Sequence, residues 1–277
     1  MSAPAPLRLR PLEVGDLLDE TFRMYRRHFV LFAGISVILS IPAAALSGYT
    51  YYSIFGAFLQ QVGTGQALDL NSLRATIGAI AVGSLINLGL VPFLYGAVTY
   101  AACESALGRE VTAGSVVRAV LRRYFQLFGY ALVILLMGIV FCLIPLWIWI
   151  WVGWAVAMPI MFIENAGLIA ALRRSWRLVE GRWWRTFLMI VLIFILVYVA
   201  RLALDAFIVL GQVVLQIVLS SVATGWIFAA ATAVVDSLVT PLIQIALVLI
   251  YFDLRVRREG LDLFQQAQLV AAPQPSA

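Results

Sequence analysis

Three ionisable residues interrupt two long apolar segments in the second half of the chain: Arg201, Asp205 and Asp236. Ionisable side chains are costly inside a membrane and mark candidate functional sites. Arg201 lies 15 residues after Thr186, and Asp236 lies 15 residues before Tyr251. At 1.5 Å per residue each lies about 22 Å from the same membrane boundary, the one on the cytoplasmic side, so two neighbouring helices can pair them. A structural ion pair is the favoured interpretation, and a polar site for a headgroup, ion or substrate is the alternative.

A second group of candidates lies in and just after the basic segment 165–182. In helical register its apolar residues, Trp176 among them, share one face and its first arginines share the other, which is typical of a helix at a membrane surface. Tryptophan and arginine are also the residues that anchor a helix at the headgroup layer. The candidate lipid or partner surface comprises Arg173, Arg174, Trp176, Arg177, Arg182, Trp183, Trp184 and Arg185.

Signatures of catalysis are missing from the sequence. His28 is the single histidine, so neither a His-based metal site nor a two-histidine acid/base pair can be built. No phosphate-binding loop, nucleophile elbow or CxxC pair occurs. Cys103 and Cys142 are interpreted as packing thiols. We therefore expect no catalytic residue, no metal, no cofactor and no enzymatic activity.

The composition is that of an integral membrane protein. Hydrophobic residues make up 63% of the 277 residues and charged residues only 12%, whereas globular domains are about 45–50% apolar. The net charge of +5 is carried by arginine, with no lysine, and the arginines gather at the ends of apolar segments. That placement indicates membrane topology and argues against nucleic-acid binding. The expected fold is an all-α, polytopic membrane protein.

Six spans are predicted, together with three amphipathic interfacial helices. The interfacial helices are expected near 11–28, 112–125 and 165–182. The spans are expected at about 29–55 and 76–102, twice within 126–163 with a turn near Ile144-Pro145, from 186, and at about 226–252. The tryptophans at 147–154 are interpreted as an aromatic belt at the outer interface. Residues 208–221 either continue the fifth span or form an outer interfacial helix, the second alternative being favoured.

The positions of the arginines predict the orientation. This scheme puts all but two of them on one side, Arg74 lying opposite and Arg201 within a span. By the positive-inside rule both termini and the three amphipathic helices are cytoplasmic, in a bacterial plasma membrane. Residues 11–262 form one membrane domain, and the tails 1–10 and 263–277 are expected to be disordered.

Three stretches carry a resemblance to a known family: LRPLEVGDLLDETFRMYRRHFVLF (9–32), ALRRSWRLVEGRWWRTF (171–187) and LIYFDLRVRREGLDL (249–263). In these the chain resembles the membrane domain of bacterial glycerophosphoryl diester phosphodiesterases and its stand-alone multi-span relatives. For fused members the resemblance implies a separate soluble phosphodiesterase barrel. The histidines and acidic metal ligands of that barrel have no counterparts here, so the resemblance does not imply phosphodiesterase activity.

Two functions are therefore carried forward as hypotheses. The leading one is a non-catalytic protein that anchors or organises a partner or lipids through its basic amphipathic helices. Anionic lipid headgroups are the expected partners, with a protein partner or homo-oligomer as further possibilities and no nucleic acid. The alternative is a transporter, channel or lipid-moving protein that uses Arg201, Asp205 and Asp236.

Overall fold

The computed structural model describes residues 13–51, 70–139, 144–218 and 221–260. Within these ranges the chain is helical and contains no strand. The helices are α1 (Val14–Arg27), α2 (Phe29–Tyr51), α4 (Leu70–Ala106), α5 (Ala113–Ile139), α6 (Ile144–Trp154), α7 (Ala157–Ile163), α8 (Leu168–Val179), α9 (Trp183–Val218) and α10 (Ser221–Glu259). The predicted tails, 1–10 and 263–277, lie outside the described residues.

The fold class predicted from composition is confirmed. Five segments are long and apolar enough to cross a membrane, and a sixth is added if the bent pair α1–α2 counts as one span. The segments lie within α4, α5, α6 with α7, α9 and α10. The protein is therefore an all-α, multi-pass membrane protein.

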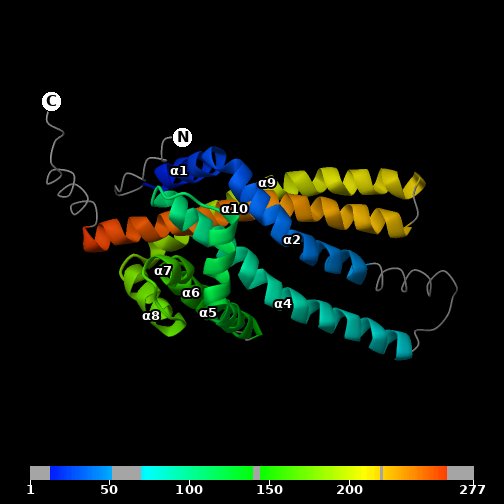
Figure 1. Cartoon of the computed structure of the whole chain (residues 1–277), viewed down its shortest axis with the longest axis horizontal. Helices are drawn as coiled ribbons and strands as arrows, with labels where there is room; N and C mark the ends of the chain where they lie inside the picture. Colours follow the sequence, from blue (N-terminus) through cyan, green and yellow to red (C-terminus); the bar gives the residue numbers. More distant parts are fainter. Residues whose placement is uncertain (1–12, 52–69, 140–143, 219–220, 261–277) are drawn as a thin grey trace.

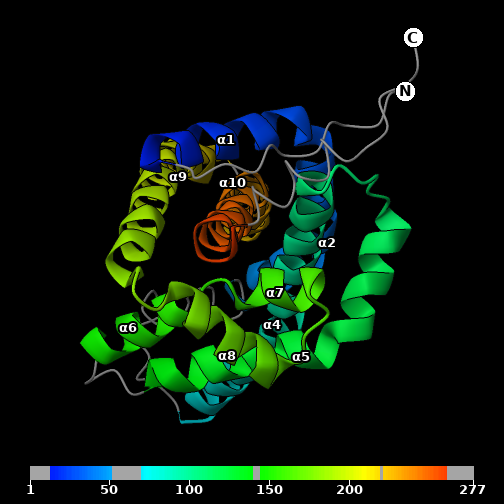
Figure 2. The same ribbon diagram turned by 90° about the vertical axis from the view of Figure 1, so that its left-hand side faces the viewer.

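Four helices extend away from the rest of the fold (Figure 1). We call α2, α4, α9 and α10 the extending helices, and the group formed by α1, α5, α6, α7 and α8 the cap. Figure 2 looks from the cap along α10, which is surrounded by the other helices. The start of α1 and the end of α10 lie at this same end of the molecule (Figure 1).

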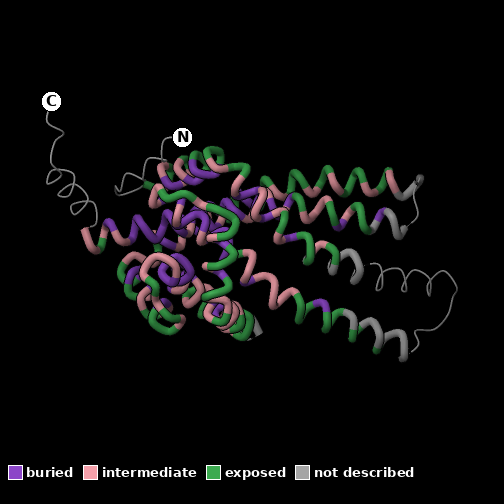
Figure 3. The backbone as a smooth tube through the Cα atoms, viewed as in Figure 1, coloured by how far each residue is buried: buried purple, intermediate pink, exposed green. Residues whose placement is uncertain are grey.

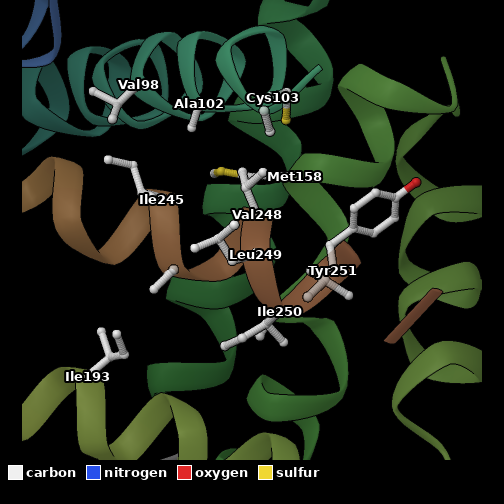
Figure 4. Packing of buried hydrophobic residues seen from close by; sticks show 14 of the residues in the cluster. Val98, Ala102, Cys103, Met158, Ile193, Ile245, Val248, Leu249, Ile250 and Tyr251 are labelled. Carbon is white, nitrogen blue, oxygen red and sulfur yellow. The ribbon is translucent and has the colours of Figure 1, made fainter. Parts of the chain in front are cut away.

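The hydrophobic core surrounds the half of α10 that runs through the cap. Ile245 and Leu249 are fully buried, and so is the Tyr251 side chain. In Figure 4, Ala102 of α4 lies on one side of α10 and Ile193 of α9 on the opposite side. Burial is concentrated at this end, whereas the described residues of the extending helices farther from the cap are mostly intermediate or exposed (Figure 3). Exposed apolar helix surface is what lipid covers in a membrane protein.

The amphipathic helix predicted at 11–28 is confirmed as α1. Its first turn is closed by a hydrogen bond from the Glu13 amide to Asp16 Oδ2 at 3.3 Å. It ends at His28, where the chain bends by 78° into α2. The buried residues of α1 include Leu17 and Met24, so its apolar face packs against protein. Tyr25 fixes it by donating a hydrogen bond to the Leu238 carbonyl of α10 at 2.8 Å.

The helix predicted at 112–125 is not a separate element. Thr112 begins it as expected, since its Oγ1 accepts a hydrogen bond from the Ser115 amide at 3.3 Å. The helix then continues without a break as α5 to Ile139. Neither Pro nor a Gly-rich turn separates the basic part from the apolar part, so the helical hydrogen-bond ladder propagates across the predicted boundary.

The predicted outer helix at 208–221 is also wrong, and the less favoured alternative holds. α9 is one helix of 36 residues, about 54 Å long at 1.5 Å per residue and therefore longer than the roughly 30 Å apolar thickness of a bilayer. Beyond Phe207 it still packs along α10, because Ile208 and Gln212 share a pocket with Thr224 and Phe228. The part of α9 beyond Phe207 is therefore a continuation of the same helix along α10 and not a separate helix.

The predicted outer belt of tryptophans is misplaced. Trp149 of α6 meets Trp176 of the basic helix α8 edge-on, with ring centroids 4.6 Å apart. The predicted turn at Ile144-Pro145 is the start of α6, and the span predicted after it, Pro145–Ile163, is built from two helices, α6 and α7. The tryptophan cluster therefore lies beside the basic helix and not on the opposite side of the membrane.

Candidate functional site

The three ionisable residues singled out from the sequence meet in the structure. Arg201 and Asp205 are one turn apart on α9, with Nε and Oδ2 separated by 3.2 Å. The same guanidinium pairs through Nη1 with Oδ1 of Asp236 on α10. The matched depths calculated from the two apolar segments therefore predicted a real contact. We call Arg201, Asp205 and Asp236 the Arg201 cluster.

The surroundings of the Arg201 cluster are apolar and open. The exposed fractions of the three side chains are 42%, 34% and 44%. Next to Arg201 on α9, Tyr198, Val199 and Leu202 are more than half exposed. α9 and α10 both contain segments long and apolar enough to cross a membrane, and the cluster is partly exposed on their surface and not enclosed in the protein core. An unpaired charge at such a depth costs about 2.5–3.5 kcal/mol.

The charges of the Arg201 cluster do not balance. With both carboxylates ionised, one guanidinium faces two negative groups, and the cluster carries a formal charge of −1. Oδ1 of Asp205 is buried and has no hydrogen-bond partner among the described residues. Together these features leave the cluster able to accept a proton or another positive group.

A third helix reaches the Arg201 cluster. Tyr95 of α4 interacts electrostatically with both Asp236 and Arg201. Its side chain is 36% exposed. The sequence interpretation missed this residue, because a single tyrosine in an apolar segment has no distinguishing pattern.

A second ion cluster, the cap cluster, joins α10 to α8 and to the end of α7. It comprises Glu164, Arg174, Tyr251, Arg255 and Glu259. The Tyr251 hydroxyl donates to Glu164 Oε1 at 3.0 Å and accepts from Arg255 Nη1 at 3.0 Å. Arg255 Nε donates to Glu259 Oε2 at 2.9 Å, and Arg174 Nε pairs with Glu164 Oε2 at 3.1 Å and also bridges to Glu259. Two cations meet two carboxylates, so the cluster is neutral.

The electrostatics of Arg174 show how tightly the cap cluster is coupled. Burial by itself lowers the pKa of this guanidinium, but the hydrogen bonds and negative charges of Glu164 and Glu259 outweigh burial and raise it. The charged form of Arg174 is thus stabilised by two partners within the protein. The sequence interpretation, which placed Arg174 on a free basic surface, did not anticipate either partner.

A buried carboxylate lies beside the cap cluster. The side chain of Asp253 is fully buried and pairs with Arg257 at 2.9 Å and with Arg185 of α9 at 3.4 Å. The pair with Arg257, four residues along α10, follows the helical spacing at which opposite charges meet. Asp253 therefore links α9 to α10 at the cap end.

The arginines of the predicted lipid or partner surface divide into two groups. Arg174 and Arg185 form the ion pairs described above, and Arg182 donates to a main-chain carbonyl of α10 at 3.3 Å. Arg173 and Arg177 are exposed on α8. The structure thus leaves only two of the five predicted arginines directed away from the protein.

The tryptophans of that surface divide in the same way. Trp176 packs on Gly153 of α6 so closely that a Cβ at Gly153 would lie 2.4 Å from its ring. Trp183 donates from Nε1 to the Trp149 carbonyl at 3.1 Å. Trp184 is 77% exposed. Two of the three predicted membrane-anchoring tryptophans therefore hold helices together.

In the described part of the chain, no set of three or more His, Cys, Asp or Glu side chains is arranged to hold a metal ion. His28 ends α1, and Cys103 is a buried free thiol of α4. Cys142 lies outside the described residues.

The chain matches no protein-family model, no curated protein and no solved structure. The resemblance to the glycerophosphoryl diester phosphodiesterase membrane domain therefore stays a prediction.

Proposed function

We propose that this protein binds a positively charged group within the membrane and moves it across, as a transporter or lipid-moving protein, with the Arg201 cluster as its site. The observation that carries the proposal is the half-exposed, negatively unbalanced cluster in the middle of α9. A purely structural ion pair between two helices is best hidden from lipid. The favoured sequence interpretation was a structural pair, and the exposure of all three side chains is what now favours a site.

The proposed ligand chemistry follows from the charge. A proton or an ammonium group would neutralise the formal charge of −1. Asp236 is the proposed binding carboxylate, because it lies on a different helix from Arg201 and can change partner when α9 and α10 shift. Asp205 keeps Arg201 paired, since both lie on one turn of α9. Arg201 would then alternate between one and two carboxylate partners.

The proposed orientation places the arginine-rich parts of the cap helices at the cytoplasmic surface of a bacterial membrane. The cap helices α1, α5 and α8 carry most of the exposed arginines, and cytoplasmic segments are enriched in arginine. The start of α1 and the end of α10 lie together at this end, which supports cytoplasmic termini (Figure 1). The ligand would reach the Arg201 cluster from the membrane, through the exposed side of α9 and α10.

Reconstituted vesicles test this proposal with two probes. An enclosed pH dye reports proton movement under an imposed membrane potential, and a fluorescent phosphatidylethanolamine reports movement of an amine headgroup between leaflets. The wild type should move at least one probe, and Asp236→Asn should abolish that movement. Glu104→Gln is the matched control, since its carboxylate pairs with Arg109 near the protein surface. Wild-type vesicles that move neither probe faster than protein-free ones, or an Asp236→Asn variant as active as the control, would overturn the proposal.

Anchoring or lipid organisation is the second candidate function. The specific observation in its favour is that three residues of the predicted surface are exposed: Arg173 and Arg177 on α8, and Trp184 at the start of α9. Each well-placed arginine contributes about 1 kcal/mol to the attraction of anionic lipid. The double variant Arg173→Gln/Arg177→Gln should lower the ratio of phosphatidylglycerol to phosphatidylcholine retained by the purified protein. An unchanged ratio would exclude this surface.

A further inference from the structure

An apolar groove lies between the start of α6 and the start of α9. Its volume is about 660 Å³, within the roughly 300–1,000 Å³ of small-molecule sites. Pro145, Leu146 and Trp149 line one wall, and Trp183, Trp184 and Phe187 line the other. Almost no polar surface lines it.

The two walls of the groove are held rigidly. The hydrogen bond from Trp183 Nε1 to the Trp149 carbonyl ties α9 to α6. Trp183 stacks on Phe187 with centroids 5.1 Å apart and ring planes 9° from parallel. Trp184 meets both of these rings edge-on. These contacts connect the residues of the two walls to one another.

The position of the groove indicates what covers it. Trp183 is the first residue of the membrane-spanning segment of α9, so the groove opens where that segment enters the membrane. Leu146 is 44% exposed and Trp149 46%. At this level the covering molecule is lipid, and a lipid chain matches an apolar, aromatic lining.

The positive charge of nearby arginines favours lipids with an anionic headgroup. Trp149, in the groove wall, contacts Trp176 of α8. Arg177 follows Trp176 directly, and Arg173 lies one turn earlier; both are exposed. A molecule with its chain in the groove would lie beside α8, whose exposed Arg173 and Arg177 offer guanidinium groups that bind phosphate well.

We propose that this groove holds one acyl chain of an anionic phospholipid, with the phosphate bound by Arg173 and Arg177. The site is distinct from the Arg201 cluster. It rests on the second candidate function and gives it a defined ligand, because the basic surface would then bind one lipid specifically and not a general anionic layer.

Native mass spectrometry of the full chain, released from bilayers that contain phosphatidylglycerol and phosphatidylcholine, tests the site. The wild type should retain one phosphatidylglycerol in preference to phosphatidylcholine. Leu146→Trp, which fills the groove, should remove that retained lipid. Leu210→Trp is the matched control, because Leu210 is an exposed leucine of α9 outside the groove lining. The control should retain lipid as the wild type does.

The arginine variants separate the groove from the surface. Arg173→Gln/Arg177→Gln should weaken phosphatidylglycerol retention about 30-fold, two arginines contributing about 1 kcal/mol each, while phosphatidylcholine still enters the groove. If Leu146→Trp retains phosphatidylglycerol as the control does, the groove proposal fails even where the arginine variants confirm the basic surface. Equal retention of both lipids by the wild type overturns the headgroup assignment and the second candidate function together.

Discussion

The two ion clusters on α10 differ in almost every respect that bears on function. The cap cluster joins α10 to α8 and the end of α7, and its charged side chains are 22–28% exposed. The Arg201 cluster joins only α9 and α10 by ion pairs, and its side chains are 34–44% exposed. The first is neutral, whereas the second carries an excess negative charge.

This difference separates a structural cluster from a candidate site. In the cap cluster every charge has an opposite partner, and the cluster lies where helices converge, so its removal should cost stability. In the Arg201 cluster one carboxylate exceeds the available cations, and the neighbours are exposed apolar residues. Removing the Arg201 cluster should weaken ligand binding more than it lowers the stability of the fold. Four substitutions test this contrast, in order of expected effect.

Asp253→Leu should be the most destabilising. It leaves Arg185 and Arg257 without their shared buried carboxylate, and loss of one partner from a buried ion pair costs about 3–5 kcal/mol. Thermal unfolding in detergent, followed by tryptophan fluorescence, measures the loss. An unfolding midpoint equal to that of the wild type would show that the cap end does not depend on its ion pairs.

Arg201→Leu should destabilise less, by about 2–3 kcal/mol, because it leaves two carboxylates facing each other at the membrane interior. The same unfolding assay applies. The double variant Arg201→Leu/Asp205→Asn should recover part of the loss, since it removes one of the two negative charges. A double variant less stable than the single one would contradict this account of the cluster.

Gly153→Ala should cost about 1–3 kcal/mol by overpacking, because the new Cβ would lie 2.4 Å from the Trp176 ring. Gly15→Ala in α1 is the matched control: no atom lies within 4 Å of its new Cβ. We expect the control to be neutral or slightly stabilising. Equal midpoints for both variants would mean that α6 and α8 do not pack as described.

Ser237→Ala should have the smallest effect, about 1 kcal/mol. It removes the buried hydrogen bond of 2.8 Å between the hydroxyls of Ser237 on α10 and Ser40 on α2. The double variant Ser40→Ala/Ser237→Ala should cost less than the sum of the two single variants, because either single substitution already removes the hydrogen bond that the two hydroxyls share. Strictly additive losses in the unfolding assay would exclude this hydrogen bond.

Local patterns in the sequence were sufficient for several features of the structure. Equal distances from two segment ends predicted the contact between Arg201 and Asp236. The i,i+4 spacing of Asp253 and Arg257 on one helix accounts for their ion pair. The amphipathic pattern predicted α1 and its end at His28. Each of these depends only on residues within one helix or on simple helix geometry.

Features set by packing between helices could not be predicted in the same way. The amphipathic pattern of α8 is real, but its apolar face contacts α6 and α7 and not lipid, as Trp176 on Gly153 shows. Hydropathy likewise gave no sign that Trp149 would meet Trp176. A missed local signal was Gly181, whose φ of +77° separates α8 from α9.

The most direct test compares Asp236→Asn with Glu164→Gln in the same vesicles and in the same unfolding assay. We expect Asp236→Asn to lose probe movement while its unfolding midpoint stays near that of the wild type. We expect Glu164→Gln to lower the midpoint and to retain movement in the protein that stays folded. The opposite pattern, with movement lost only in Glu164→Gln, would contradict the assignment of the Arg201 cluster as the site.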